Sequence, residues 1–469
     1  MEYKTGTIIS INNRYVILND MHKIICQSLN EFKLLPNDIV EYYISENVIF
    51  INKILERKEQ ILFGIVESID KTSTKLYFPN LPKFYSLELP NSDILKINSS
   101  VIVKVGLDSV KVIKVYGSIK ERSYDKDLFI SLYKEQAKLF ITKPKYIETQ
   151  CHYTNEFKDL TYLNTFNVDP TESKDFDDAI SIDETENKIY VHIVDANEQI
   201  EPLSNIDIIA LKQSFTLYLP EHIQNILPKE MAEDKLSLVK GLERKVITVE
   251  FIINPDTQDI VSHSIYKSII KIKERYDYVK FNNSLNKYPM LIKFYNRWKK
   301  NTMNIPYVKL NVNIDDGELI NYTKENSFDD AHKIIETLMI LTNLTVSEHV
   351  ANLIPQRYHA KVKQEFEMTT FTGNSVIDSI LSIKKYKPAI YDANNTGHFG
   401  LNLNSYTHFT SPIRRYFDVI IHRLLAGKSY ENIEEILDHI NKQEMYVEKL
   451  VKTYNNLKIL TYFEKNTNV

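Results

Sequence analysis

The sequence predicts an α+β protein of several domains, in which two small β-barrels precede a larger mixed α/β domain and C-terminal helices. A chain of 469 residues is too long for one ordinary hydrophobic core, so two to four domains are expected. Short β segments at close spacing fill residues 1–120, whereas helical periodicity is clearest near the end. Hydrophobic residues make up 43% and charged residues 26%, which places the chain among globular proteins rather than disordered ones.

Residues 1–57 and 58–120 each contain a series of short strands separated by turns. The first series is TGTIISI, RYVILND, KIICQSL, DIVEYYI and VIFINKIL, and the second is ILFGIVESI, KLYFPN, SVIVKV and KVIKVYG. Both series are typical of OB-like (cold-shock-like) β-barrels. Such barrels commonly bind nucleic acids but also serve as spacers or protein-binding modules, so the pattern leaves their role open.

Residues 121–156 are expected to form a helical or irregular connector. Its lysines indicate a solvated face rather than phosphate contacts: Lys134, Lys138, Lys143 and Lys145. The mixed α/β domain should follow at 157–427. Its clearest helix begins after Ser327 or Asp329, because the following residues keep helical spacing on one face: Ile334, Ile335, Leu338, Met339 and Thr342.

The last segment, 428–469, is also predicted to be helical from Asn432 onward. Apolar residues fall at i, i+3, i+4 and i+7, and the spacing then resumes: Ile433, Ile436, Leu437, Ile440, Val447 and Leu450. No C-terminal β-barrel is expected after this helix.

The net charge and the cysteine content indicate which binding partners and which cellular compartment to expect. The formal net charge is −4, so binding of a polyanion would need a local basic channel. Cys26 and Cys151 lie far apart and match no zinc spacing, which favours a reducing compartment without disulfides. Neither a signal peptide nor an apolar run of about 18 residues is found, so we expect a soluble, cytoplasmic protein without a membrane partner.

Four aspartates are crowded into FNVDPTESKDFDDAISI, residues 166–182: Asp169, Asp175, Asp177 and Asp178. Two carboxylates about 4 Å apart repel by roughly 4 kcal/mol at an effective dielectric near 20. Such a cluster therefore needs a cation or bound protons, and hard oxygen ligands suit Mg²⁺ or Mn²⁺. The alternative is a solvated acidic turn. A calcium loop fits less well, because the glycine and closing glutamate of an EF-hand are missing.

A second group of polar residues lies in HFGLNLNSYTHFTSPIRRYFDVIIHRLL, which begins at His398. Thr410, Ser411 and Pro412 are expected to form a turn, with Arg414 and Arg415 at the start of a helix. Guanidinium groups match phosphate oxygens, and a helix N-terminus adds backbone donors. The alternative is that both arginines pair with Asp418 or glutamates in a structural network. His422 and Arg423, further along the helix, are expected to be buried scaffold.

Taken in order, several blocks of the sequence resemble the RNB, or ribonuclease II-like, family of 3′→5′ exoribonucleases. The blocks are KDLTYLNTFNVDPTESKDFDDAISI (158–182), VHIVDANEQI (191–200), SFTLYLPEHIQNILP (ending at Pro228), KLSLVKGLERKVITVEF, ERYDYV (274–279), HKIIETLMILTN (332–343), QRYHAK (356–361) and YTHFTSPIRRYFDVIIHRLL (406–425). The resemblance covers roughly residues 157–427 and implies an RNB-type catalytic domain there.

The resemblance also implies a role for each matching residue. Asp169, Asp175 and Asp178 would coordinate the metal, Asp177 would take part most directly in the chemical step, and Arg414 would hold and polarise the scissile phosphate. Near the RNA 3′ end, Tyr276 would stack on a base, Glu336 would contact the terminal ribose and Tyr218 would line the channel. These roles suit the chemistry, because a metal-activated water and an arginine serve phosphodiester hydrolysis. Stacking tolerates any base, and the 2′-hydroxyl distinguishes RNA from DNA. Without the resemblance, Tyr218 and Tyr276 would be read as core residues.

The chain departs from the family pattern in three places. Thr337 stands where many members carry a second acid after Glu336, so contacts to the last nucleotide should differ. The aromatic residue that sandwiches the base is not placed; Pro306 and Tyr307 lie in the right region. Members commonly end in a small RNA-binding barrel, and without it we expect weaker grip on long RNA and lower processivity.

The predicted function is hydrolytic, metal-dependent 3′→5′ degradation of single-stranded RNA to nucleoside 5′-monophosphates, with Mg²⁺ as cofactor and Mn²⁺ as a substitute. One alternative is an inactive RNA-binding protein on the same scaffold. Another is a metal phosphoesterase for small molecules, which leaves the two N-terminal barrels unexplained. No protein partner is predicted.

Overall fold

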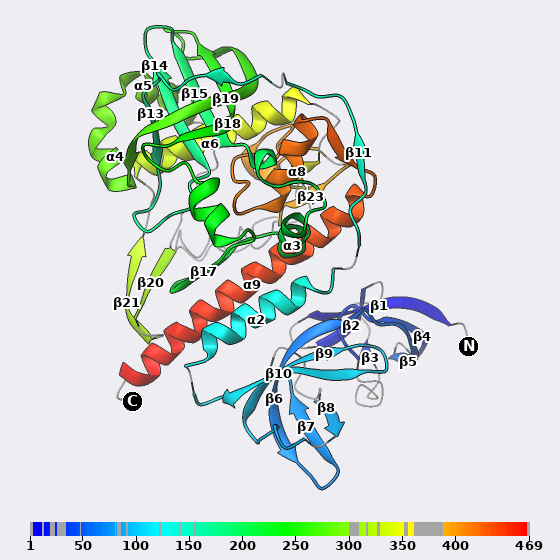
Figure 1. The fold of residues 1–469 in the computed structure, drawn as a ribbon. Helices are drawn as coiled ribbons and strands as arrows, with labels where there is room; N and C mark the ends of the chain where they lie inside the picture. Colours follow the sequence, from blue (N-terminus) through cyan, green and yellow to red (C-terminus); the bar gives the residue numbers. More distant parts are fainter. Residues whose placement is uncertain are drawn as a thin grey trace. The chain divides into compact units, whose positions relative to one another are not determined.

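The computed structural model forms two compact units, Met1–Ile141 and Thr142–Val469. It describes residues 3–299 except 12–13, 19–23, 26–33, 47, 80, 82–85, 91, 122, 141 and 154–155, and then 309–315, 318–325, 329–350, 355–360, 388–394 and 396–466. The boundary between the units falls inside the predicted connector. Helix α2 (Asp125–Ala137) belongs to the first unit, and strand β11 (Tyr146–Glu148) belongs to the second (Figure 1).

The first unit contains two five-stranded sheets, one for each predicted strand series. The first has the order β2-β1-β4-β5-β3, with strands Lys4–Ile11 (β1), Arg14–Ile17 (β2), Ile24–Ile25 (β3), Ile39–Ser45 (β4) and Val48–Glu56 (β5). Its buried residues include Ile8, Val40 and Ile49. The carboxylate of Asp38, just before β4, is fully buried and pairs with Arg57 at 2.6 Å, which ties the start of β4 to the residue after β5.

The second sheet has the order β10-β9-β6-β7-β8. Its strands are Gln60–Ile69 (β6), Ser73–Tyr77 (β7), Ser86–Pro90 (β8), Ser99–Val105 (β9) and Val110–Ser118 (β10). Val66, Leu76 and Val103 lie in its core. The strands lie where the sequence predicts them except for β8, which the predicted series does not include. Closure of either sheet into an OB-like barrel stays a prediction.

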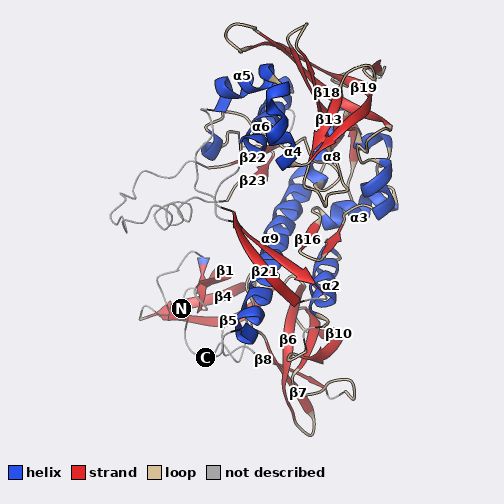
Figure 2. Cartoon of the chain, turned by 90° about the vertical axis from the view of Figure 1, so that its left-hand side faces the viewer, coloured by secondary structure: helices blue, strands red, loops and turns tan. Residues whose placement is uncertain are grey.

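The second unit is built on a six-stranded sheet. Its strands are Lys158–Asp159 (β12), Thr165–Val168 (β13), Asp178–Asp183 (β14), Lys188–Val194 (β15), Glu243–Ile253 (β18) and Ile260–Tyr276 (β19). The order is β12-β19-β13-β14-β15-β18, and β18 also pairs with β19, so five strands form a closed cycle of pairings. Figure 2 shows the long β18–β19 pair beside β13.

A row of buried polar side chains connects the strands of this sheet. The row is a chain in which each side chain is hydrogen-bonded to the next at 2.5–2.9 Å: Thr165, Ser181, His192, Thr248 and Ser268. These residues come from β13, β14, β15, β18 and β19 in that order. Burial lowers the pKa of His192 to about 3, so its ring is neutral at physiological pH. Each buried polar group thus has a partner, and a shift in strand register would leave several without one.

Helices and short hairpins surround this sheet. The helices are Asn205–Gln213 (α3), Tyr278–Ser284 (α4), Pro289–Trp298 (α5), Asp330–His349 (α6), Tyr416–Leu425 (α8) and Ile433–Asn466 (α9), with short turns of helix at Ala196–Glu198, Met231–Lys235, Leu285–Lys287 and Phe399–Leu401. The hairpins pair Leu217–Leu219 (β16) with His222–Gln224 (β17), Lys309–Asp315 (β20) with Glu318–Glu325 (β21), and Gln356–Tyr358 (β22) with Ile390–Asp392 (β23). Strand β11 pairs with Lys428–Tyr430 (β24).

The two predicted helices are confirmed. Helix α6 begins after Asp329, whose side chain accepts a hydrogen bond from the His332 amide at its N-terminus. Ile334 and Leu338 are buried on its inner face. Helix α9 begins at Ile433, buries Ile436 and Ile440, and packs against β16, β21, β23 and α3.

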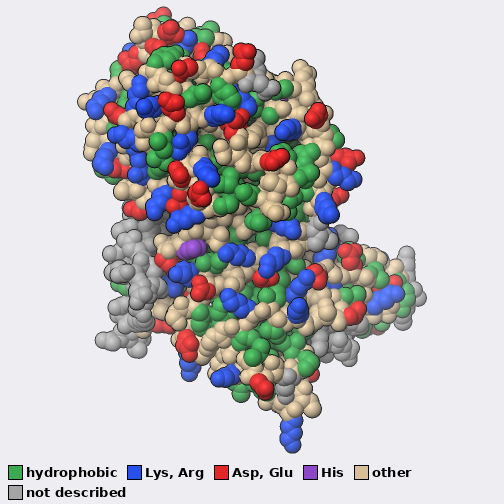
Figure 3. All heavy atoms as spheres, in the orientation of Figure 1, with side chains coloured by type: hydrophobic (Ala, Val, Ile, Leu, Met, Phe, Trp, Pro, Cys, Tyr) green, Lys and Arg blue, Asp and Glu red, His purple; other side chains and the backbone are tan. Residues whose placement is uncertain are grey.

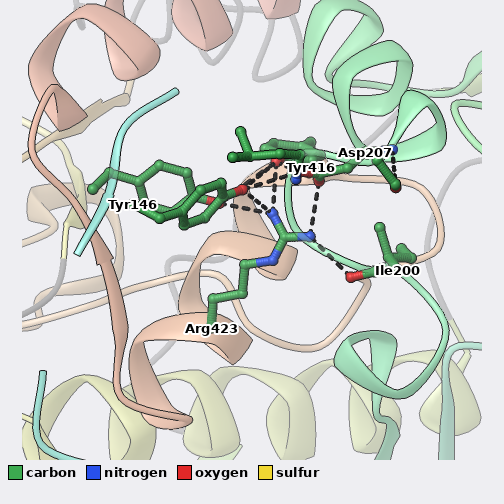
Figure 4. A network of polar contacts seen from close by, with 8 residues as sticks. Tyr146, Ile200, Asp207, Tyr416 and Arg423 are labelled. Atoms are coloured by element: carbon green, nitrogen blue, oxygen red, sulfur yellow. Dashed lines mark hydrogen bonds and ion pairs between the residues drawn. The ribbon is translucent and has the colours of Figure 1, made fainter. Parts of the chain in front are cut away.

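Helix α8 is anchored by a buried arginine (Figure 4). The guanidinium of Arg423 pairs with Asp207 of α3 at 2.8 Å, and neither side chain is exposed. It also donates to the hydroxyls of Tyr146, Tyr416 and Tyr430 at 2.5–2.9 Å. His422 is buried as well. The prediction that His422 and Arg423 are scaffold is therefore confirmed.

No helix in the described part of the chain is long and apolar enough to cross a bilayer. Figure 3 shows basic and acidic side chains interspersed over the visible face of the molecule, in keeping with a net charge near zero.

Candidate active site

The four aspartates lie where the chain leaves β13 and returns as β14. Asp169 directly follows β13, and Asp178 is the first residue of β14. The backbone is tied down at both ends: the Asp169 amide donates to the carbonyl of Tyr276, and the Val194 amide donates to that of Asp177. Because β13 and β14 are antiparallel neighbours, the loop between them brings its two ends back together. The cluster predicted from sequence spacing is therefore a spatial cluster.

Burial makes Asp169, Asp177 and Asp178 hard to ionise, and the charges of neighbouring aspartates add to this for Asp169 and Asp177. Asp177 is only 4% exposed, and burial raises its pKa well above the usual range despite the opposing effects of Arg414 and the Ile413 amide. Burial also raises the pKa of Asp169, and the charges of Asp178, Asp177 and Asp175 raise it further. The pKa of Asp178 is raised to about 6. Several acids that perturb one another in this way need protons or a cation between them.

The chemistry of the carboxylates suits a hard divalent cation, although the described side chains do not form a complete ligand set. The Oδ2 atom of Asp169 is buried, and within the described residues it has no hydrogen-bond partner. Among the described residues, no group of three or more Asp, Glu, His or Cys side chains is arranged so that it could hold a metal ion. Asp169, Asp175 and Asp178 lie near enough for the charges of the other two to act on Asp169, but metal coordination by all three stays a prediction. Mg²⁺ typically takes one or two carboxylates and completes its shell with water and phosphate oxygens, so an open set suits it.

Arg414 lies beside this cluster although it is more than 230 residues away in sequence. The Ile413 amide donates to Oδ1 of Asp177 at 2.8 Å, across 236 residues of chain. Nε of Arg414 lies 3.5 Å from Oδ2 of Asp177, and the Arg414 side chain is 45% exposed. Its Nη2 donates to Oγ of Ser411 at 2.9 Å. The guanidinium therefore borders the acidic cluster while part of it faces solvent.

Arg415 points the other way. It forms a two-pronged pair with buried Asp418, with contacts of 2.9 and 2.7 Å, and Asp418 also accepts from the Ser411 amide. The structural alternative considered for the two arginines therefore holds for Arg415 and not for Arg414.

The hairpin β16–β17 brings Tyr218 to the same place. The Tyr218 hydroxyl donates to Oδ2 of Asp175 at 2.7 Å, and the residue is 38% exposed. The hairpin is held against the arginine turn, because the Thr216 amide donates to the carbonyl of Arg414 and the Tyr416 amide to that of Ser214. Tyr218 is thus at the acidic cluster and is not a core tyrosine.

Tyr276 lies elsewhere than its predicted stacking role requires. Only 7% of it is exposed, and its ring packs against Phe166 and Phe281 with centroids 5.5–5.6 Å apart. Its hydroxyl contacts Glu274 and Tyr288. A base would have no free ring face here. The assignment of base stacking to Tyr276 is therefore corrected: the residue closes the core at the end of β19.

Tyr278, two residues later, has the position that sequence reasoning assigned to Tyr276. It is half-buried at the start of α4, and burial together with the charges of Asp178 and Asp169 raises its pKa. Its ring lies parallel to the ring of His332 at 3.6 Å between centroids, with 5° between the planes. The segment ERYDYV contains both tyrosines. Strand β19 ends at the buried Tyr276, and α4 begins at Tyr278, which lies near enough to Asp178 and Asp169 for their charges to act on it.

Glu336 is exposed on α6, one turn after His332. Partial desolvation raises the pKa of its carboxyl, and His332 lowers it. The adjacent Thr337 is buried, and its hydroxyl donates to the carbonyl of Lys333. A second acid at position 337 would therefore face the interior of this unit. Pro306 and Tyr307, considered as partners for base stacking, lie outside the described residues.

Comparison with known sequences finds one family. The sequence model described as "RNB domain" matches residues 157–431. The chain is 29% identical over 406 residues to ribonuclease R of Aquifex aeolicus, covering 71% of this chain and 57% of that protein. It is 27% identical over 384 residues to ribonuclease R of Chlamydia pneumoniae, covering 71% and 56%. The chain thus spans just over half the length of these curated relatives.

Comparison with solved structures agrees on the fold. RNase R of Mycoplasma genitalium, in complex with ribose-methylated single-stranded RNA, superposes with a TM-score of 0.77 at 22% identity, covering 98% of this chain and 87% of that one. Yeast Ssd1, described as a pseudonuclease, superposes with a TM-score of 0.70 at 16% identity, covering 96% and 73%. Since a nuclease and a pseudonuclease share the fold, the site residues must decide between activity and its loss.

Proposed function

Because this chain belongs to the RNB domain family, we propose that it is a divalent-metal-dependent exoribonuclease that shortens single-stranded RNA from its 3′ end and releases nucleoside 5′-monophosphates. The observation that carries the proposal is the approach of Arg414 to within 3.5 Å of Asp177, inside a cluster of four aspartates. A cation site bordered by a guanidinium suits a phosphodiester, whose negative charge both can bind. The curated relatives named ribonuclease R support the same activity.

In this proposal Asp169, Asp175 and Asp178 hold Mg²⁺, or Mn²⁺ in its place. When bound, the cation supplies an activated water and neutralises charge on the phosphate. The exposed part of Arg414 binds the phosphate oxygens and stabilises the charge that develops on them. Asp177 is held by the Ile413 amide and faces Arg414, so it orients the guanidinium and takes part most directly in the chemical step.

The end of the RNA is recognised by side chains around the cluster. Tyr278 takes the stacking role first assigned to Tyr276, because its ring lies near Asp178 and Asp169. Glu336, exposed on α6, contacts the terminal ribose, where the 2′-hydroxyl identifies RNA. Tyr218 lines the same end and holds Asp175 through its hydroxyl.

The test is cleavage of 5′-end-labelled single-stranded RNA with Mg²⁺, alongside DNA of the same sequence. Wild type should produce labelled fragments that shorten from the 3′ end, release nucleoside 5′-monophosphates and leave the DNA intact. Asp177→Asn should abolish cleavage. Asp183→Asn is the matched control, because Asp183 lies at the far end of the same strand and caps a turn.

Two results would contradict the proposal. If wild type and Asp177→Asn both bind RNA and leave it intact with Mg²⁺ and Mn²⁺ across pH, the chain is an RNA-binding protein on a nuclease scaffold. If small phosphate esters are hydrolysed in preference to RNA, it is a phosphoesterase.

A further inference from the structure

The loop that carries the acidic cluster has no regular secondary structure of its own. Residues 170–177 form neither helix nor strand, although three of the four aspartates lie in it or directly after it. Such a loop needs outside contacts to hold carboxylates that repel one another. Tyr218 and the Ile413–Arg414 segment contact its carboxylates, and among the described residues the side chains of Arg275 and Ser237 bind its backbone.

Arg275 of β19 binds the first half of the loop. Its Nη2 donates to the backbone carbonyls of Thr171 at 2.9 Å, Pro170 at 3.2 Å and Ser173 at 3.3 Å. Its guanidinium carbon lies 4.7 Å from the centre of the Phe176 ring. Strand pairing explains the position, because Arg275 is the partner of Asn167 in the β13–β19 ladder, two residues before Asp169.

Ser237 binds the second half. Its hydroxyl donates to the carbonyl of Lys174 at 2.7 Å and accepts from the Phe176 amide at 3.0 Å. The Leu238 amide then donates to the carbonyl of Phe176. Asp175 therefore lies between Lys174 and Phe176, whose backbones are hydrogen-bonded to Ser237. Asp169 directly precedes Pro170, the first residue whose carbonyl accepts a hydrogen bond from Arg275.

We propose that Arg275 is a positioning residue that holds loop 170–176 so that Asp169 and Asp175 stay in place to bind the divalent cation. The inference rests on the proposed function only in naming the cation. A guanidinium is well matched to this role, since it can donate hydrogen bonds to several carbonyls while it packs on an aromatic ring. Arg275 then acts on metal affinity and not on RNA affinity.

The competing explanation is that Arg275, which is exposed, binds an RNA phosphate directly. Lys273 provides a matched control. It lies two residues earlier on the same strand, so its side chain points to the same face, and its Nζ donates to the carbonyl of Tyr162 rather than to the loop. Arg275→Ala and Lys273→Ala each remove one positive charge from this face.

The experiment measures Mn²⁺ binding by calorimetry on the full chain without RNA, and RNA binding by fluorescence anisotropy in EDTA. Arg275→Ala should weaken Mn²⁺ binding about tenfold or more, as loss of an outer-sphere support commonly does. Its RNA affinity should match that of Lys273→Ala, and Lys273→Ala should bind Mn²⁺ like wild type. The rise in melting temperature on adding Mn²⁺ should shrink for Arg275→Ala alone.

The proposal is overturned if Arg275→Ala binds Mn²⁺ as tightly as wild type, or if it weakens RNA binding while metal binding is unchanged. Should Arg275→Ala fail to fold, Arg275→Lys carries the same test, because it keeps the charge and loses the fork. Mn²⁺ binding is measured without RNA, so this test does not depend on nuclease activity. A wild type that binds Mn²⁺ but leaves RNA intact would contradict the proposed function and not this inference.

Discussion

At the scale of single residues, the site depends on carboxylates that are costly to ionise without a cation. Asp178 has a pKa near 6 in the folded chain, against 3.8 for an ordinary aspartate. Between these two values the folded protein binds more protons than the unfolded chain. The stability of the metal-free protein therefore falls as pH rises through about 6, since the linkage relation gives a negative slope wherever the folded state holds more protons.

This titration predicts how metal binding depends on pH. Binding requires ionised carboxylates, so the apparent Mn²⁺ affinity should rise with pH by about tenfold per unit for each proton displaced. The rise should continue through pH 6, because the pKa of Asp169 is raised as well. Calorimetry at several pH values measures the profile. The control Asp183→Asn should follow the wild-type curve. An affinity independent of pH between 5 and 7 would contradict the shifted pKa.

Arg414 provides a second prediction at this scale. Arg414→Lys keeps a positive charge but loses the forked donors that match a phosphate. The catalytic rate should fall by about a hundredfold or more, because a hydrogen-bond donor that stabilises the charge developing on the phosphate oxygens in the transition state is lost. Single-turnover cleavage of a short RNA measures it, and Mn²⁺ affinity should stay near wild type. Arg415→Lys is not a neutral control, because Arg415 forms a buried pair with Asp418.

At the scale of elements, the junction of β19 and α4 separates Tyr276, which packs in the core, from Tyr278, which we propose stacks on a base. Tyr278→Ala should weaken binding of single-stranded RNA by about tenfold, since stacking one base contributes roughly 1–3 kcal/mol. Tyr278→Phe should retain most of the affinity. Tyr276→Phe keeps the packed ring and should bind RNA like wild type. Anisotropy in EDTA measures all three, and loss of binding by Tyr276→Phe would restore the original assignment.

Helix α8 depends on the buried pair of Arg423 with Asp207. Arg423→Ala leaves Asp207 buried without its partner and should cost about 3–5 kcal/mol of unfolding free energy. Urea denaturation measures the loss. Lys442→Ala breaks an exposed pair with Asp438 and should change stability by less than about 1 kcal/mol. Equal effects of the two substitutions would show that the network does not stabilise the helix.

At the scale of the whole molecule, all residues assigned to catalysis and RNA binding lie in the second compact unit, 142–469. A fragment of these residues should therefore bind Mn²⁺ and cleave short single-stranded oligonucleotides at a rate close to that of the full chain. Its affinity for longer RNA should fall if the first unit contributes an RNA-binding surface. Loss of Mn²⁺ binding by a folded fragment would contradict the assignment of the metal site to residues 142–469 alone.

Much of this protein follows from sequence alone, because the signals are local. Strand spacing placed the strands of the two N-terminal sheets except β8, and helical periodicity and the Asp329 cap placed α6. Helix α9 begins where its apolar spacing does. The aspartate cluster could be recognised because its members share ten positions. Local pattern also identified Arg423 as scaffold, since a charged residue on an apolar helix face needs a buried partner.

Features that depend on contacts between distant segments became visible only in the folded chain. Nothing in the chain near Arg414 and Arg415 shows which one meets Asp177, more than 230 residues away, and which pairs locally. Two tyrosines in one hexapeptide look alike until the end of β19 buries Tyr276 and the start of α4 places Tyr278 near Asp178 and Asp169. The support of the acidic loop by Arg275 arises from a parallel strand pairing between residues 167 and 275, and pairing of that kind leaves no trace in either local sequence.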